Sequence, residues 1–213
     1  MGLTLHSAWR ATAPYRVRIG LALKGLPYDY AAIDLIAGEQ SRPEYKAVNP
    51  QGLTPALDLG DGTVLTQSLA ILEWLEETRP TPPILPRAAM DRAVVRAMAG
   101  VIACDIHPLN NTRGGRDLHK RGLDQAGILA WTQRWIKDGF DALEPMVARH
   151  GRGFAFGDTP TIADCCLIPQ VYSALRYEVD LTPYPRLKAV TDRANEHPAF
   201  AAAHPNRQPD AKP

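Results

Sequence analysis

The sequence is poor in cysteine, and the few thiols it has are badly spaced for chemistry. Its three cysteines are Cys104, Cys165 and Cys166, and no Cys-x-x-Cys motif occurs. Cys165 and Cys166 would point to different sides of a helix, so neither a redox pair nor a zinc site is expected. We predict that all three are buried as small apolar residues. No metal site is predicted either, because no histidine has ligand spacing with nearby acids.

The chain also lacks long apolar runs and a marked net charge. The apolar stretch at 94–106 is interrupted by Arg96 and is too short to cross a bilayer. No basic segment followed by an apolar run marks a signal peptide at the amino terminus. The net charge of +1 gives no reason to expect nucleic acid or an anionic membrane as a partner. These absences predict a soluble, cytoplasmic protein.

The first 80 residues alternate between strand and helix patterns. Asp61-Gly62 between two short apolar runs is typical of a tight hairpin turn. Pro14 and Gly25 fit the first turn and the end of a helix. The expected order is β-α-β-α-β-β-α. The predicted strands lie at 3–6, 28–35, 56–59 and 64–66, and the predicted helices at 16–24, 43–48 and 68–78.

The remainder of the chain has no convincing strand. Residues 79–86 carry four prolines, which is typical of a stiff linker between domains. Two domains are therefore expected, at 1–80 and 87–213. The helical patterns of the second domain lie at about 88–115, 121–149, 161–177 and 184–196.

Two details of the second half carry separate expectations. Thr161 and Asp164 are similar to a capping box, although Asp158 and Thr159 offer a competing helix start. The final residues, 205–213, are polar and rich in proline, which predicts a loose tail.

The most informative stretch joins an X-Pro bond to a short apolar strand and a Gln-Ser pair. Proline at the start of a strand donates no amide and takes the cis form at low cost. The Thr54-Pro55 bond could therefore leave the backbone of Thr54 free to pair with a peptide-like molecule. Ser68, a good N-cap residue after Gln67, lies where a helix dipole and open amides attract a carboxylate. Together these features predict a pocket for a small anionic peptide.

With this order of elements, the chain resembles the cytosolic glutathione transferases. Residues 9–19 are similar to the zeta-class signature, in which Arg-Ser-Ser-Cys leads into Arg-Val-Arg-Ile, and three further segments match the class at 105–111, 156–164 and 180–185. The similarity covers essentially the whole chain and is greatest to maleylacetoacetate and maleylpyruvate isomerases.

This resemblance implies the glutathione transferase fold, α/β plus all-α. A thioredoxin-like N-terminal domain would bind glutathione, and an all-helical C-terminal domain would complete the substrate site. The family resemblance also implies a homodimer.

The sequence departs from the zeta motif at its catalytic position. Ala11-Thr12-Ala13 stands where the class has Ser-Ser-Cys, so Thr12 is the only hydroxyl left to meet the glutathione thiol. A hydroxyl donor and a helix N-terminus both favour a thiolate. The alternative is that Thr12 merely caps the first helix. Leu53 is a second departure, where many relatives have glutamine, and Gln51 is expected to take over some of that polar contact.

For glutathione, the resemblance implies backbone contacts from Thr54, shaped by a cis Pro55. It places Gln67 and Ser68 at the γ-glutamyl carboxylate, although Ser68 could be only a helix cap. Gln51 is expected to reach toward the glycyl end.

The resemblance adds two residues from the helical half to the glutathione site. His107 and Asn111 are spaced four apart, which predicts one helical face closing over glutathione. For His107, a buried histidine bonded to a neighbouring carbonyl is an equal alternative.

A substrate with two carboxylates favours arginine, whose guanidinium is planar, bidentate and always charged. Three arginines are candidates for substrate binding, Arg10, Arg113 and Arg176, against the default of a solvated surface role. Arg10 lies beside Thr12 and is counted with it as catalytic. Arg16 and Arg18 are expected to flank the helix or a subunit contact.

Three functions remain open on the sequence. The first is a glutathione-dependent cis–trans isomerase of maleylacetoacetate or maleylpyruvate, acting by reversible thiolate addition in aromatic catabolism. The second is a general glutathione transferase that conjugates small electrophiles and needs no arginine cluster. The third is a non-catalytic binding module on the same fold.

Overall fold

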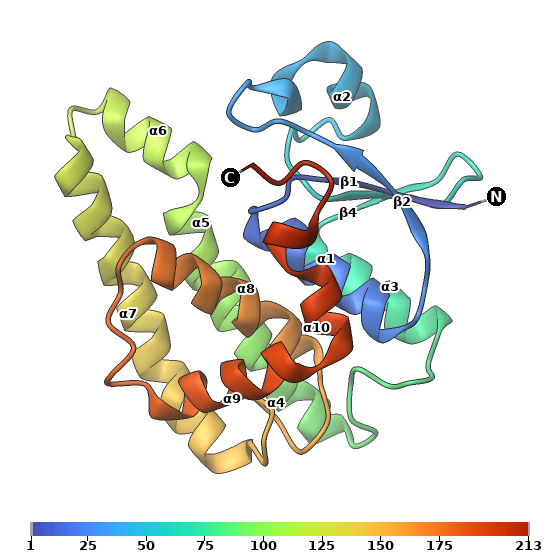
Figure 1. Ribbon diagram of the computed structural model, residues 1–213, viewed down its shortest axis with the longest axis vertical. Coiled ribbons are helices and arrows are strands. Elements are labelled where there is room, and N and C mark those ends of the chain that lie inside the picture. The colour runs from blue at the N-terminus through green and yellow to red at the C-terminus, as the bar shows by residue number, and fades with distance from the viewer. Residues whose placement is uncertain (1, 213) are drawn as a thin grey trace. The chain divides into compact units, whose positions relative to one another are not determined.

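The computed structural model describes residues 2–212, which fall into two compact units (Figure 1). The first unit combines Met1–Ile84 with Glu196–Pro213, and the second is Leu85–Asn195. The break after Ile84 falls within the predicted proline-rich linker. The far end differs from the predicted second domain of 87–213, because its last residues group with the amino-terminal unit.

A mixed sheet of strand order β2-β1-β3-β4 forms the centre of the first unit. The central strand β1 (Leu3–Ser7) pairs in parallel with β2 (Tyr28–Ala32) and antiparallel with β3 (Ala56–Asp58). β3 then forms the predicted hairpin with β4 (Val64–Thr66). The second strand is shorter than the predicted 28–35.

Helices cover both sides of this sheet, with α1 (Thr12–Leu23) and α3 (Ser68–Thr78) on one side and α2 (Pro43–Val48) on the other (Figure 1). The predicted order β-α-β-α-β-β-α is confirmed. α1 begins at residue 12 rather than 16, because a proline in the first turn removes no intrahelical hydrogen bond. A short helix, η1 (Glu39–Ser41), precedes α2.

Close contact between α1 and α3 depends on one glycine. A Cβ atom at Gly20 would lie 2.3 Å from Leu72 Cδ2, so a larger residue fits only if the Leu72 side chain or α3 shifts. Leu72 is itself fully buried. The two helices therefore pack closely, which matters because both begin at candidate site residues.

A buried ion pair fixes the end of the first unit. Lys24 Nζ lies 2.7 Å from Glu76 Oε2, and the side chains are 0% and 8% exposed. Lys24 also donates to the carbonyl of Pro82 at 2.6 Å, and Glu76 accepts the amide of Ile84 at 2.9 Å. The linker is thus bound to α1 and α3 where it leaves the unit.

The carboxy-terminal segment, defined here as His204–Lys212, is not the predicted loose tail. It follows α10 (Pro198–Ala203), which packs against α1, and it includes the short helix η3 (Pro205–Arg207). The Gln208 amide is buried and donates to the carbonyls of Ala202 and His204 at 3.1 and 2.9 Å. The segment is ordered because it finds hydrogen-bond partners in the fold, which its polar composition could not reveal.

The second unit consists of helices around the buried helix α8 (Ile162–Arg176), which packs against α4 (Ala89–Gly100). Thr161 is the N-cap of α8 and forms the predicted capping box with Asp164, so the competing start at Asp158 or Thr159 is excluded. The remaining helices are η2 (Val101–Ile106), α5 (His107–Asn110), α6 (Thr112–Lys120), α7 (Gln125–His150) and α9 (Pro185–Glu196).

The predicted single helix over 88–115 is interrupted. After α4 the chain winds into the wider π-helix η2, and Pro108 in α5 lacks the amide that a regular helix would use. Asn111 then adopts an extended conformation between α5 and α6. Cys104 lies in η2 and is exposed, so the prediction of burial holds for Cys165 and Cys166 but is wrong for Cys104.

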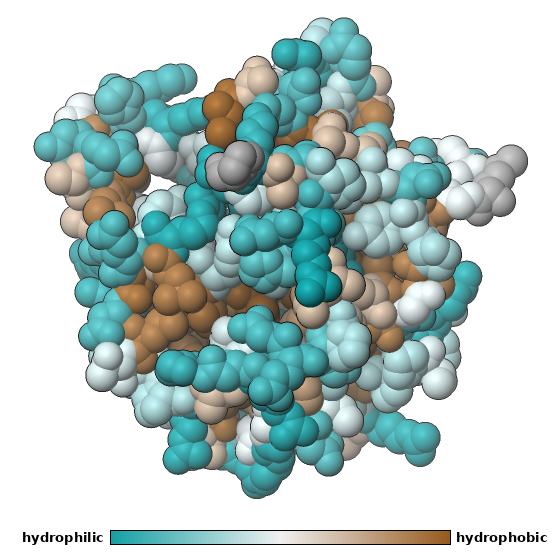
Figure 2. Space-filling model, in the orientation of Figure 1, coloured by the Kyte–Doolittle hydropathy of each residue, from teal (hydrophilic) through white to brown (hydrophobic). Residues whose placement is uncertain are grey.

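The surface over α6 is largely hydrophilic on the face shown in Figure 2. This agrees with the charged sequence of the helix, Thr-Arg-Gly-Gly-Arg-Asp-Leu-His-Lys. None of the helices within residues 2–212 combines the length and the apolar character that a membrane span requires.

Candidate functional site

The first turns of α1 and α3 meet through a buried arginine. Thr12 and Ser68 are the first residues of the two helices. Arg16, one turn after Thr12 on α1, donates from Nη1 to Ser68 Oγ at 3.2 Å and is 2% exposed. The positive end of the α3 dipole and a guanidinium from α1 thus lie together, which is favourable for an anion.

Neither helix start is capped by a side chain. Ala11 occupies the N-cap position of α1 and Gln67 that of α3, both without a side-chain hydrogen bond to the first turn. The alternative role of Thr12 as a cap is therefore excluded, and the prediction of Ser68 as an N-cap is wrong by one residue. Gln67 has a φ of 67°, a left-handed conformation that is rare outside glycine and concentrates at functional sites.

The backbone before the X-Pro bond is held by two side chains. The carbonyl of Leu53 accepts the hydroxyl of Tyr45 at 2.7 Å and the amide Nδ2 of Asn49 at 2.6 Å. Burial raises the pKa of Tyr45 to about 12, so it remains a donor at neutral pH. The Thr54-Pro55 bond is cis, as predicted. Thr54 is thus presented by a loop whose preceding carbonyl is fixed.

Two predicted glutathione ligands are hydrogen-bonded to each other. Gln67 Nε2 donates to Gln51 Oε1 at 2.8 Å, although 16 positions separate them in sequence. Gly52, next to Gln51, has a φ of 63°, and a Cβ atom there would lie 2.9 Å from the carbonyl of Gln40. Only glycine suits this turn, which sets the direction of the Gln51 side chain.

Arg10 lies on the turn that joins β1 to α1. The amide of Ala11 closes this turn on the carbonyl of Ala8 at 3.1 Å. The guanidinium of Arg10 stacks over the Trp9 ring, 5.4 Å from its centroid, which holds the charge near the start of α1. Arg10 and Thr12 are therefore both on the short segment that enters α1.

Of the four candidates from the second unit, three lie on α5, α6 and α8, and Asn111 lies between α5 and α6. His107 begins α5 and Arg113 is an exposed residue in the first turn of α6. Arg176 ends α8, exposed, with its guanidinium 5.9 and 5.8 Å from the ring centroids of Tyr172 and Tyr177. The structure leaves their roles as predictions.

The prediction that His107 and Asn111 share one helical face is wrong. The two residues do not share one helical face, because α5 ends at Asn110 and Asn111 is extended. The Asn111 side chain caps α6 by accepting the amide of Gly114 at 2.8 Å. The capping preference of asparagine was a signal for this role, and the four-residue spacing was misleading.

The sequence interpretation missed the structural arginines. Arg16 and Arg18, expected to flank the helix or a subunit contact, are 2% and 0% exposed. Arg18 donates to Ser7 Oγ and to the carbonyls of Ala8, Trp9 and Ala203. The available signal was periodicity, since Thr12 and Arg16 lie four residues apart and so share a face of α1. Within the described part of the chain, no group of His, Cys, Asp or Glu is placed to hold a metal ion.

Comparison with known proteins places this chain in a family. Residues 13–78 match the family model "Glutathione S-transferase, N-terminal domain", and 130–193 match "Glutathione S-transferase, C-terminal domain". The chain is 51% identical to a maleylpyruvate isomerase of Ralstonia, with 98% of this chain and 100% of the relative covered. The chain belongs to the glutathione S-transferase family.

Two solved structures of this family are similar over nearly the whole length. One is a maleylpyruvate isomerase described as a bacterial glutathione S-transferase of the zeta class, with a TM-score of 0.96, 50% identity and 98% and 100% of the two chains covered. The other is a maleylacetoacetate isomerase of Anaeromyxobacter dehalogenans with glutathione in its active site, with a TM-score of 0.91, 43% identity and 99% and 98% covered. The predicted glutathione S-transferase fold is confirmed.

Proposed function

We propose that this chain is a glutathione-dependent cis–trans isomerase of a maleyl keto-diacid, maleylacetoacetate or maleylpyruvate. The observation that carries the proposal is the hydrogen bond from the buried Arg16, one turn after Thr12 on α1, to Ser68 at the uncapped start of α3. The similarity to maleylpyruvate and maleylacetoacetate isomerases supports the same conclusion.

The residues present fit glutathione. The γ-glutamyl carboxylate is an anion, and the start of α3 offers it free amides, Ser68 and the nearby Arg16 charge. The Gln51–Gln67 pair presents amide groups beside this point, and Thr54 offers its backbone for an antiparallel contact with the peptide. When bound, glutathione supplies the thiolate that adds reversibly to the cis double bond and leaves after rotation.

The chain's own residues then have two tasks. Thr12, 7% exposed at the start of α1, would donate its hydroxyl to the sulfur and hold it as thiolate. Arg10, and from the second unit Arg113 and Arg176, would bind the two carboxylates and the keto oxygen of the substrate. Charge at that oxygen increases during addition, so a nearby guanidinium stabilises the transition state more than the ground state.

Two residues of the second unit are also assigned to the glutathione site. His107 and Asn111 are proposed to contact glutathione, Asn111 from its position at the start of α6. A homodimer in the cytoplasm is proposed from the family resemblance, with residues 1–80 as the glutathione-binding domain to which His107 and Asn111 add contacts. The expected context is aromatic catabolism, where ring cleavage yields maleyl keto-diacids.

The isomerase proposal predicts turnover without loss of glutathione. Protein, glutathione and maleylpyruvate or maleylacetoacetate are mixed, and the cis-enone absorbance and the free thiol are followed together. We expect the absorbance to fall over many turnovers while the thiol concentration stays constant. Thiol loss in step with the absorbance would instead establish a conjugating transferase. Absence of calorimetric binding of glutathione would favour the non-catalytic module.

Ser68 tests the glutathione site directly. A Ser68→Ala variant loses a hydroxyl at the proposed carboxylate, so we expect its glutathione Kd to rise by about tenfold or more, the value of one hydrogen bond to a charged group. Calorimetry measures the Kd, and Ser41→Ala, at an exposed position of η1, is the matched control. An unchanged Kd in a folded Ser68→Ala protein would remove Ser68 from the site.

A further inference from the structure

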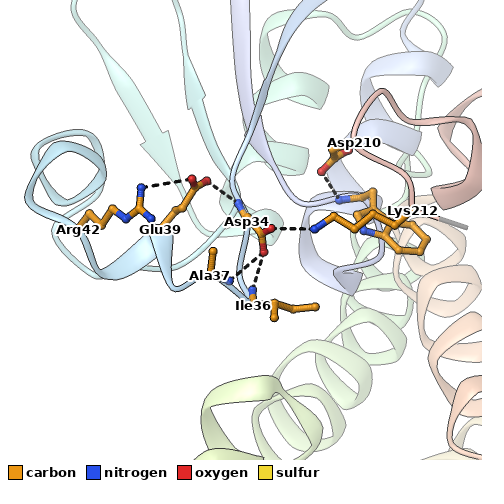
Figure 3. Close-up of polar contacts among 8 residues, drawn as sticks. Asp34, Ile36, Ala37, Glu39, Arg42, Asp210 and Lys212 are labelled. Carbon is orange, nitrogen blue, oxygen red and sulfur yellow. Dashed lines mark hydrogen bonds and ion pairs between the residues drawn. The ribbon is translucent and has the colours of Figure 1, made fainter.

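The turn that carries Arg10 is held by the carboxy-terminal segment. Asp210 Oδ2 accepts the backbone amide of Trp9 at 3.0 Å, a contact between residues 201 positions apart. Figure 3 shows the Asp210 carboxylate directed at this turn from the carboxy-terminal segment. Trp9 immediately precedes Arg10. Thr12, two residues after Arg10, is the first residue of α1.

Arg18 completes the support of the same peptide unit. Its Nη2 donates to the carbonyl of Trp9 at 2.7 Å, and its Nε donates to the carbonyl of Ala203 at 3.0 Å. The amide and the carbonyl of Trp9 are thus both bound to charged groups, and hydrogen bonds of this kind are short and strong. Asp210 also interacts electrostatically with Arg18 and with Tyr30.

A second tie connects the segment to the loop between β2 and α2. Lys212 Nζ lies 2.9 Å from Asp34 Oδ2, and Asp34 Oδ1 accepts the amides of Ile36 and Ala37 at 2.8 and 3.0 Å (Figure 3). The hydrogen bond from the Ala37 amide, followed by those from Lys212 and the Ile36 amide, lowers the pKa of Asp34 to about 2. The pair is exposed, and surface ion pairs contribute little. Lys212 is therefore a natural control for Asp210.

We propose that Asp210 is a positioning residue for the thiolate site, setting the Trp9–Thr12 turn so that the Thr12 hydroxyl and Arg10 meet the glutathione sulfur. This inference rests on the glutathione binding of the proposed function. It needs neither the isomerase activity nor a particular keto-diacid. Asp210 touches no reacting atom and acts through the Trp9 amide.

The test compares Asp210→Ala with Asp210→Asn and Lys212→Ala. Asparagine keeps an oxygen that can accept the Trp9 amide, whereas alanine cannot reach it. In Asp210→Ala we expect the pKa of the bound glutathione thiol to rise and kcat to fall by about tenfold or more, since a small misplacement near the reacting atoms is costly. Asp210→Asn should restore most of the loss, and Lys212→Ala should match the parent. The thiol is titrated by its thiolate absorbance in the complex.

The readout separates positioning from simple stability. A lower Tm in Asp210→Ala with an unchanged thiol titration and kcat would overturn the proposal. If Asp210→Ala does not fold, Asp210→Ser is titrated instead, because serine is polar but too short to reach the Trp9 amide. If the parent protein binds glutathione but does not isomerise the substrate, the proposed isomerase function is wrong. The thiol titration then still decides whether Asp210 positions the thiolate site.

Discussion

A Thr12→Val variant should bind glutathione and leave its thiol protonated near neutral pH. Valine matches threonine in shape, so the buried site at the start of α1 keeps its packing and loses only the hydroxyl. Without that donor the pKa of the bound thiol should move upward toward its usual value of about 8.5. Turnover at pH 7 should fall by about 10²-fold, comparable with the loss of one donor that stabilises transition-state charge.

The measurement is the pH dependence of kcat together with titration of the bound thiol. Thr12→Ser should recover most of the activity, because the hydroxyl is restored. Thr4→Val, on β1 and outside the site, is the control for the substitution itself. A thiol that titrates at the same pH in Thr12→Val and in the parent would show that Thr12 has no part in activating glutathione.

Replacement of Arg18 should produce the largest loss of stability. Arg18→Met keeps much of the side-chain volume and removes the donors that bind Ser7, Trp9 and Ala203. The unpaired buried acceptors, with Asp210 nearby, should cost about 3–5 kcal/mol of unfolding free energy, as for one partner removed from a buried ionic network. Urea unfolding at a fixed protein concentration measures this loss.

Arg42→Met is the matched control for Arg18. Arg42 pairs with Glu39 at 3.4 Å, and its side chain is 56% exposed, so the same substitution should cost less than about 1 kcal/mol. Equal losses at the two positions would contradict the view that Arg18 connects the turn before α1 to α10. If Arg18→Lys unfolds with the same free energy as the parent, a single positive charge at this position is sufficient for stability.

Local signals in the sequence were sufficient for most elements of the first unit. The hairpin followed from Asp61-Gly62 between apolar runs, and α2 and α3 have the predicted bounds. The capping box at Thr161 was likewise visible, because its two partners are three residues apart. Each of these features depends on neighbours along the chain, so a short window of sequence contains its cause.

Features that depend on distant partners were not predictable in this way. The carboxy-terminal segment is bound through Asp210 to the Trp9 amide, which is far away in sequence. The burial of Arg16 and Arg18 is likewise decided by Ser68 and Ala203. Arginine in a helix is ordinarily solvated, and only the assembled fold supplies the acceptors that make its burial tolerable. Gln51 and Gln67 were both named from the sequence, but their mutual bond was not.

The grouping of Glu196–Pro213 with Met1–Ile84 has a consequence for biosynthesis. Translation is vectorial, and the whole helical insertion, 85–195, leaves the ribosome before α10 exists. Until then the Arg18 guanidinium has no Ala203 carbonyl and the Trp9 amide has no Asp210. A nascent chain therefore carries an incompletely supported turn before α1 until residues 196–212 have been added.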